Sequence, residues 1–171
     1  YAALGNGGLL HKPSFVKGQK GKSQQVLATA IADQVLHMMQ TVTEPGGTAT
    51  QAAILGYHVA GKTGTSRKAS AGGYSRRYIG YFAGLVPVDK PRFSMVVAIN
   101  DPTKGSYYGG IVSGPVFRNV MEGALRMMDV SPDNLDAWLA AQAEAEAKRL
   151  KALGHKAPVE VASASMSRAS Q

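Results

Sequence analysis

A cation, a hydroxyl group and a glycine stand side by side in the triplet Lys62-Thr63-Gly64, and a second hydroxyl follows at Thr65. Residues 59–65 read as a β-strand. At such a strand Lys62 can attract a carboxylate, Thr63 and Thr65 can donate hydrogen bonds to it, and the backbone N–H of Thr65 can form half of an oxyanion hole. Gly64 leaves the strand edge open to a substrate that adds as a further strand. The triplet therefore indicates a site for an extended, carboxylate-bearing substrate, although three residues also fit an ordinary exposed strand end.

A second pattern overlaps the triplet. Residues 56–63 satisfy Gly-x-x-x-x-Gly-Lys-Ser/Thr, the phosphate-binding loop of many nucleotide-binding proteins. That loop needs a helix directly after Lys-Thr, because the amides at the helix N-terminus face the phosphates. Residues 64–73 are a poor helix former with glycines at both ends. A P-loop-type nucleotide-binding module stays as an alternative, and Mg²⁺-dependent binding of ATP or GTP through Lys62 would identify it.

The composition is that of a globular protein with a strong positive charge. Hydrophobic residues make up 44% of the 171 residues, which argues against wholesale disorder, and the absence of cysteine excludes disulfides and thiolate zinc sites. The net charge is +8, and no acidic residue lies between Glu44 and Asp89. Lys62, Arg67, Lys68, Arg76 and Arg77 fall in that interval, and a second basic stretch near the N-terminus holds His11, Lys12, Lys17, Lys20 and Lys22.

Three readings of this charge differ in the partner they imply. Solvated loops need no partner, a basic cleft would attract carboxylates, and a basic non-catalytic binding module would bind nucleic acid or an anionic membrane in a strongly salt-dependent way. Aromatic residues spaced as in an RNA-binding sheet are not evident, so we expect no nucleic acid partner.

The periodicity of apolar residues predicts helices at both ends of a group of strands. Apolar residues recur at helical spacing over 27–42, and we expect Met38 and Met39 to fill the core. Residues 78–86 and 93–99 read as an antiparallel pair of strands, with a flexible loop over 70–77. A second helix is expected to be capped by Ser113, with Pro115 in its first turn. An Ala-rich helix is expected over 135–154 and a disordered tail over 155–171.

A series of segments, in order along the chain, resembles the transpeptidase domain of class B penicillin-binding proteins, most of all the septal, cell-division type of Gram-negative bacteria. The resemblance covers residues 1–134, in the C-terminal part of that domain. The segments are Gly46-Gly47-Thr48-Ala49, residues 56–66, residues 80–87, Pro91-Arg92-Phe93, Ile99-Asn100-Asp101-Pro102, Tyr107-Tyr108-Gly109-Gly110, Ser113-Gly114-Pro115-Val116-Phe117 and Pro132-Asp133-Asn134.

The resemblance implies an α+β fold, a five-stranded antiparallel sheet flanked by helices, of which this chain would supply the C-terminal half. It implies that Lys62, Thr63, Gly64 and Thr65 bind the carboxylate of a D-Ala-D-Ala stem peptide or a β-lactam, with the Thr65 backbone as an oxyanion donor. Arg67, Tyr107 and Tyr108 would border the cleft, although loop packing also explains the tyrosines. We expect His58 to be a packed residue and not a base. No metal or cofactor is implied.

Besides Lys-Thr-Gly, the family pattern has two further active-site motifs, Ser-x-x-Lys with the nucleophile and Ser-x-Asn, and the chain departs from it at both. Ser14-Phe15-Val16-Lys17 fits Ser-x-x-Lys, but Pro13 precedes it and Gly18 follows, so the helix that a serine nucleophile of this family needs cannot form. No Ser-x-Asn occurs anywhere in the chain. We therefore expect Ser14 not to be a nucleophile, the nucleophile to lie outside this chain, and the chain alone to be inactive.

The whole parent would be a serine-type peptidoglycan D,D-transpeptidase that cross-links stem peptides during septal cell-wall synthesis. It would act at the periplasmic face of the bacterial inner membrane, held by an anchor helix outside this chain, and would meet the membrane proteins of the divisome. A serine β-lactamase or a carboxypeptidase stays as an alternative within the same chemistry.

Overall fold

The computed structural model describes residues 1–19 and 21–152, and the predicted tail over 155–171 lies outside them. Short 3-10 turns occur at Leu4–Asn6, Thr41–Thr43 and Thr50–Ala52. The helices and strands are β1 (Leu9–His11), β2 (Ser23–Gln25), α1 (Thr29–Gln40), β3 (Ala60–Ser70), β4 (Gly73–Val86), β5 (Phe93–Asn100), α2 (Gly109–Met127) and α3 (Leu135–Ala152). No helix in this part of the chain is both long enough and apolar enough to pass through a membrane.

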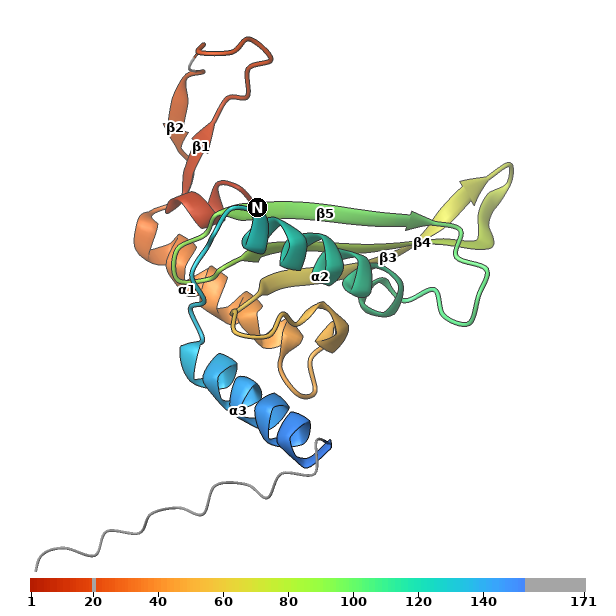
Figure 1. Cartoon of the computed structure of the whole chain (residues 1–171). Coiled ribbons are helices and arrows are strands. Elements are labelled where there is room, and N and C mark those ends of the chain that lie inside the picture. The colour runs from red at the N-terminus through yellow and green to blue at the C-terminus, as the bar shows by residue number, and fades with distance from the viewer. Residues whose placement is uncertain (20, 153–171) are drawn as a thin grey trace, which may run out of the picture.

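An antiparallel sheet of three strands in the order β3-β4-β5 forms the centre of the molecule (Figure 1). Because side chains alternate along a strand, β4 contributes apolar side chains to the packing on both faces of the sheet. Phe82 meets Phe117 of α2 edge to face, with ring centroids 4.9 Å apart. Leu85 faces the other way and packs with Leu36 of α1. The two helices thus cover opposite faces of the sheet, and the predicted α+β fold with a helix-flanked antiparallel sheet is confirmed.

The larger core lies between the sheet and α2. It also takes in the irregular segment that connects α1 to β3, so the loops before β3 are held by the same core as the strand itself. Its buried residues are Val42, Ala49, Ala52, Ile54, Val59, Phe82, Val86, Val97, Phe117, Met121 and Leu125.

Three local expectations were wrong. Residues 70–77 do not form a flexible loop, because β3 runs to Ser70 and β4 begins at Gly73, and Gly72 with a φ of 91° makes the tight turn that joins them. Helix α2 begins at Gly109, so Pro115 lies inside the helix and not in its first turn. Ser113 is buried inside it too, and its hydroxyl donates to the Gly80 carbonyl at 2.9 Å instead of capping. Met38 is exposed, and only Met39 packs against the core.

Two parts of the chain stand away from this body (Figure 1). The β1–β2 hairpin projects from it, and α3 runs off on the other side as an exposed, weakly amphipathic helix over nearly the predicted range. The sequence does not predict the hairpin, because its strands have three residues each and little apolar alternation.

Candidate functional site

Strand β3 presents Lys62, Thr63, Gly64 and Thr65 along an edge of the central sheet. Within the described residues β3 pairs with β4 only, so its other edge has no strand partner. Lys62 and Thr65 are exposed, and Thr63 and Gly64 are half-buried. The Nζ atom of Lys62 donates to the Thr63 carbonyl oxygen at 2.9 Å, which keeps the cation beside its own strand. A cation, two hydroxyl groups and open backbone therefore line this edge.

The strand also decides the P-loop alternative. The backbone after Lys62-Thr63 continues as β3 as far as Ser70, so no helix N-terminus follows the lysine. Without those amides the phosphate-binding arrangement of a P-loop does not exist here. A P-loop module is therefore excluded.

The two threonine hydroxyls are held from behind the strand. Thr63 Oγ1 lies 3.0 Å from Thr48 Oγ1, in the segment between α1 and β3. Thr65 Oγ1 accepts a hydrogen bond from the backbone N–H of Gly109 at 3.1 Å. Since that bond uses a lone pair, the Thr65 proton stays available to a ligand. Both side chains are thus fixed by their neighbours before any ligand arrives.

Helix α2 begins against the backbone of the candidate site. A Cβ atom on Gly109 would lie 2.1 Å from the Tyr81 carbonyl oxygen and 2.3 Å from that of Gly64. On Gly110 it would lie 1.9 Å from the carbonyl oxygen of Thr48. Only glycine fits at these contacts. The two glycines therefore let the start of α2 pack directly against the backbone of β3, of β4 and of the Thr48 segment.

An aromatic cluster lies beside the far end of β3. The rings of Tyr78 and Tyr107 stack with centroids 4.1 Å apart and planes at 11°, and Tyr108 lies 4.7 Å from Tyr107. The Arg67 guanidinium carbon sits 5.9 Å from the centre of the Tyr78 ring, within reach of a cation–π contact. The neighbouring Tyr108 hydroxyl raises the pKa of Tyr107 above its ordinary value. The structure thus brings Arg67, Tyr107 and Tyr108 together around Tyr78, which the sequence analysis did not single out.

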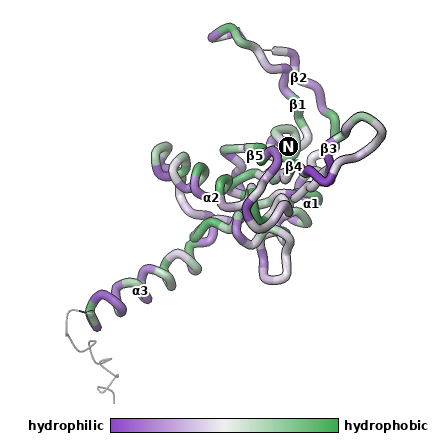
Figure 2. Tube along the Cα trace, turned by 90° about the vertical axis from the view of Figure 1, so that its right-hand side faces the viewer, coloured by the Kyte–Doolittle hydropathy of each residue, from purple (hydrophilic) through white to green (hydrophobic). Residues whose placement is uncertain are grey.

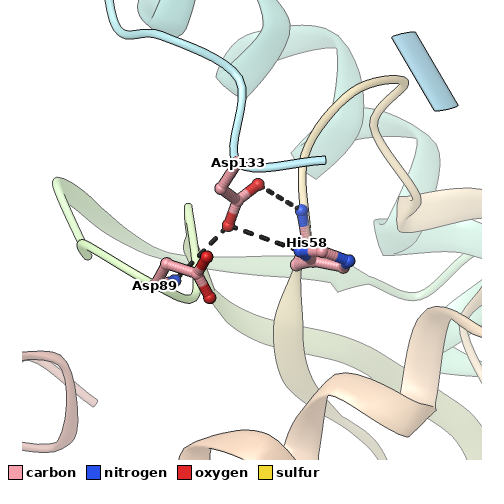
Figure 3. A group of neighbouring side chains, drawn as sticks. All are labelled: His58, Asp89 and Asp133. Atoms are coloured by element: carbon pink, nitrogen blue, oxygen red, sulfur yellow. Dashed lines mark hydrogen bonds and ion pairs between the residues drawn. The ribbon is translucent and has the colours of Figure 1, made fainter. Parts of the chain in front are cut away.

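Asp133 fastens three segments together next to the start of β3 (Figure 3). Its buried carboxylate accepts the backbone N–H of His58 at 2.7 Å and those of Val88 and Asp89 at 3.1 and 3.4 Å. His58 Nδ1 lies 3.6 Å from Asp133 Oδ2, and the imidazole is half-buried. The side-chain atoms of His58, Asp89 and Asp133 that could coordinate a metal ion lie within 4.8 Å of one another. Backbone N–H groups already donate to both Asp133 oxygens. We therefore interpret these three residues as a structural contact that holds the chain at the start of β3.

Ser14 lies in the loop of the β1–β2 hairpin and outside any helix, as predicted. Its Oγ accepts the backbone N–H of Val16 at 3.1 Å and donates to Gln19 Oε1 at 3.0 Å. These are bonds of a local turn and supply no base for a nucleophile.

Four residues of the site escaped the sequence analysis as functional residues: Thr48, Tyr78, Gly109 and Asp133. Their contacts join segments far apart in the chain, as with His58 and Asp133, which are separated by 75 positions. The available signals were the Gly-Gly pairs before Thr48 and after Tyr108, since paired glycines outside an obvious turn suggest a close backbone approach.

Comparisons with known proteins bear on the same region. The family described as the penicillin binding protein transpeptidase domain matches residues 1–122. The peptidoglycan D,D-transpeptidase FtsI of Escherichia coli strain K12 is 45% identical over 137 residues, which is 79% of this chain and 23% of that protein. A probable peptidoglycan D,D-transpeptidase, PenA of Neisseria flavescens, is 41% identical over 134 residues, 77% of this chain and 34% of that protein.

A solved structure shares the fold as well. The apo structure of the TP domain from Burkholderia pseudomallei penicillin-binding protein 3 superposes with a TM-score of 0.68 at 34% identity, over 78% of this chain and 41% of that one. This chain spans about a quarter to a third of the length of the curated relatives. The predicted resemblance is confirmed, and the chain belongs to the penicillin-binding protein transpeptidase domain family.

Proposed function

We propose that this chain supplies the carboxylate-binding part of a serine-type peptidoglycan D,D-transpeptidase of the septal type. The observation that carries the proposal is the open edge of β3, where Lys62, Thr63 and Thr65 stand beside Gly64. Thr48 holds the Thr63 hydroxyl and Gly109 holds that of Thr65. An extended peptide that ends in a carboxylate suits such an edge, because it can add as a strand while the cation and hydroxyls bind its terminus. The names of the FtsI and PenA relatives support the same activity.

Each residue then has a chemical role. Lys62 and the hydroxyls of Thr63 and Thr65 hold the terminal carboxylate of a D-Ala-D-Ala stem peptide. The backbone N–H of Thr65 stabilises the oxyanion that forms when a serine outside this chain attacks the penultimate D-Ala carbonyl. The bond to the terminal D-Ala breaks, D-Ala leaves with a proton, and the acyl group passes to an amine of a neighbouring stem peptide. A β-lactam would be trapped at the acyl stage. Arg67, Tyr107 and Tyr108 border the cleft.

The chain alone would be inactive in this proposal, because Ser14 sits in a turn and has no lysine one helical turn away. Incubation of the 171-residue chain with a fluorescent penicillin should leave its intact mass unchanged. A covalent adduct on any of its serines would contradict this part of the proposal.

The setting is part of the same proposal. The longer protein would work at the periplasmic face of the inner membrane, with an anchor helix outside this chain. Its partners would be peptidoglycan, β-lactams and the membrane proteins of the divisome.

A chimera tests the proposed chemistry directly. Residues 1–134 of this chain would replace the matching segment of E. coli FtsI, to which this chain is 45% identical. The chimera should be acylated by penicillin, and Lys62→Ala should lower the acylation rate about 10²-fold, equivalent to about 2.7 kcal/mol. Lys62→Arg should restore only part of the acylation rate, because a planar guanidinium group replaces a compact ammonium group.

Lys90→Ala serves as the matched control, since Lys90 is an exposed lysine in the connection between β4 and β5. This variant should keep the full rate. If Lys62→Ala folds and is acylated as fast as the Lys90 control, Lys62 does not bind the ligand carboxylate and the proposal fails.

A further inference from the structure

The β1–β2 hairpin is an ordered projection with its own internal hydrogen bonds. Leu9–His11 pairs antiparallel with Ser23–Gln25, and His11 Nδ1 lies 2.6 Å from Ser23 Oγ. Beyond the last ladder pair, the Lys12 N–H donates to the Lys22 carbonyl at 3.0 Å, so these two residues are neighbours across the hairpin. The hairpin leaves the body of the molecule and ends in solvent (Figures 1 and 2).

The charge on this projection has one sign. Lys12, Lys17 and Lys22 are all exposed, and no aspartate or glutamate precedes Asp33 in the sequence. Within the described residues no acidic side chain forms an ion pair with them. Like charges placed opposite each other on a hairpin cost stability, and an anion between them relieves that cost. The pairing of Lys12 with Lys22 therefore favours an anionic partner.

The loop of the hairpin also displays two apolar side chains. Phe15 is fully exposed and Val16 is 64% exposed. The turn that carries them is closed by Ser14 Oγ, which accepts the Val16 N–H, and by the Gln19 N–H, which donates to the Val16 carbonyl at 3.2 Å. Figure 2 shows a short hydrophobic stretch near the far end of the hairpin, bordered by hydrophilic residues. An aromatic ring held in water next to lysines is a surface for a ligand that is both apolar and anionic.

We propose that the β1–β2 hairpin is a docking site for peptidoglycan strands, outside the β3 edge. Peptidoglycan is a polymer of sugar rings with apolar faces and of peptides with free carboxylates. The ring of Phe15 would stack on a sugar face, and Lys12, Lys17 and Lys22 would pair with carboxylates of the stem peptides. This inference rests on the proposed function for the choice of polymer, because the same chain carries the carboxylate-binding strand.

The shape of the hairpin favours a polymer strand over a folded protein. The projection is one two-stranded ribbon with a single aromatic residue in its loop, so the surface it offers is narrow, whereas stable protein partners each bury about 800 Å². A narrow basic ribbon can instead engage several groups of one extended polymer strand at the same time, so that weak contacts combine.

Binding of the 171-residue chain to purified peptidoglycan sacculi, measured by co-sedimentation over a range of chain concentrations, tests the proposal. The triple variant Lys12→Gln, Lys17→Gln, Lys22→Gln should weaken the apparent affinity about tenfold or more, because each exposed ion pair contributes a little and three act together. Phe15→Ser should weaken it several-fold. Both changes lie in exposed positions, and an unchanged thermal melt checks that the fold is kept.

The matched control removes the same number of charges elsewhere. Lys148→Gln, Arg149→Gln, Lys151→Gln on α3 leaves an equal net charge and should change the affinity no more than about twofold. Equal losses in the two triple variants would mean non-specific attraction and would overturn the proposal. So would binding to phosphatidylglycerol vesicles that is as tight as binding to sacculi, since the partner would then be a membrane.

A further variant separates this proposal from the proposed function. If Lys62→Ala abolishes binding to sacculi and the hairpin triple variant binds normally, the β3 edge holds the polymer and the hairpin does not. Conversely, a chimera that does not react with penicillin contradicts the proposed function. The hairpin proposal is then decided by the sacculus assay alone.

Discussion

Thr48 and Thr63 are joined through their hydroxyl groups, 3.0 Å apart, although 15 positions separate them in the chain. Thr48 is also the residue whose carbonyl oxygen faces Gly110 at the start of α2. The segment around Thr48 thus contacts both β3 and the start of α2. The orientation of the Thr63 hydroxyl therefore depends on packing outside β3.

Thr48→Val removes this bond and keeps the shape of the side chain. We expect a loss of about 1 kcal/mol in the free energy of unfolding, measured by urea denaturation, because the partner at Thr63 is half-buried. In the FtsI chimera the same change should slow acylation, since the Thr63 hydroxyl is no longer held. Thr50→Val, at an exposed threonine two residues on, should alter neither quantity. Equal effects of the two substitutions would show that the hydroxyl bond is unimportant.

Two glycines of α2 should respond oppositely to alanine. At Gly110 the added Cβ would lie 1.9 Å from the Thr48 carbonyl oxygen, so the helix or the Thr48 segment must move, and we expect a loss of several kcal/mol. At Gly123 nothing lies within 4 Å, and alanine should stabilise the helix by about 0.5–1 kcal/mol. Thermal and urea unfolding of both variants provides the comparison. A Gly110→Ala variant as stable as the parent would mean that α2 does not press on the site.

Asp133→Asn tests the structural contact at the start of β3. The amide group that replaces one carboxylate oxygen would face the N–H of Val88 or of His58 and could not accept its hydrogen bond. We expect a loss of about 1–3 kcal/mol in unfolding free energy. Asp33→Asn makes the same chemical change at an exposed position on α1 and should cost little. Hydrogen exchange at His58 and Val88 should quicken only in the Asp133 variant.

The sequence predicted what depends on local pattern and on family resemblance. Apolar spacing located α1, β4 and β5, and the motif placed the candidate site residues on a strand, which is β3. It failed where a distant contact decides the outcome. Helix α2 starts four residues before Ser113, where Gly109 fits against the Gly64 backbone. Capping preferences depend on local sequence only, so they do not predict a helix start that is set by this distant contact. The sequence predicts a loop where β3 and β4 meet between Ser70 and Gly73, because the strand ends there are polar and exposed and so lack apolar alternation.

Acid should weaken the contact between Arg77 and Asp101. The hydrogen bond from Arg77 Nε to Asp101 Oδ2, at 2.6 Å, lowers the pKa of this aspartate. A carboxyl group with a lowered pKa in the folded state stabilises the fold above its unfolded pKa of about 4, and the contribution is lost as the pH falls through the folded value. In Arg77→Ala the pKa of Asp101 should rise towards its ordinary value, as read from the carboxyl carbon shift by NMR. Arg76→Ala, one residue away, should leave the Asp101 titration unchanged.

Gly64→Ala should separate folding from ligand binding. The new Cβ would meet the Tyr81 side chain at 3.6 Å, an ordinary contact, so the unfolding free energy should change by no more than about 1 kcal/mol. The methyl group would nevertheless stand on the strand that the substrate is proposed to lie along, where close backbone approach needs an empty position. We therefore expect the FtsI chimera with Gly64→Ala to melt like its parent and to react with penicillin at least about tenfold more slowly. Gly123→Ala supplies the glycine-to-alanine control away from β3, and it should react at the parental rate. If Gly64→Ala reacts as fast as that control, the ligand does not approach the backbone of β3 at this position.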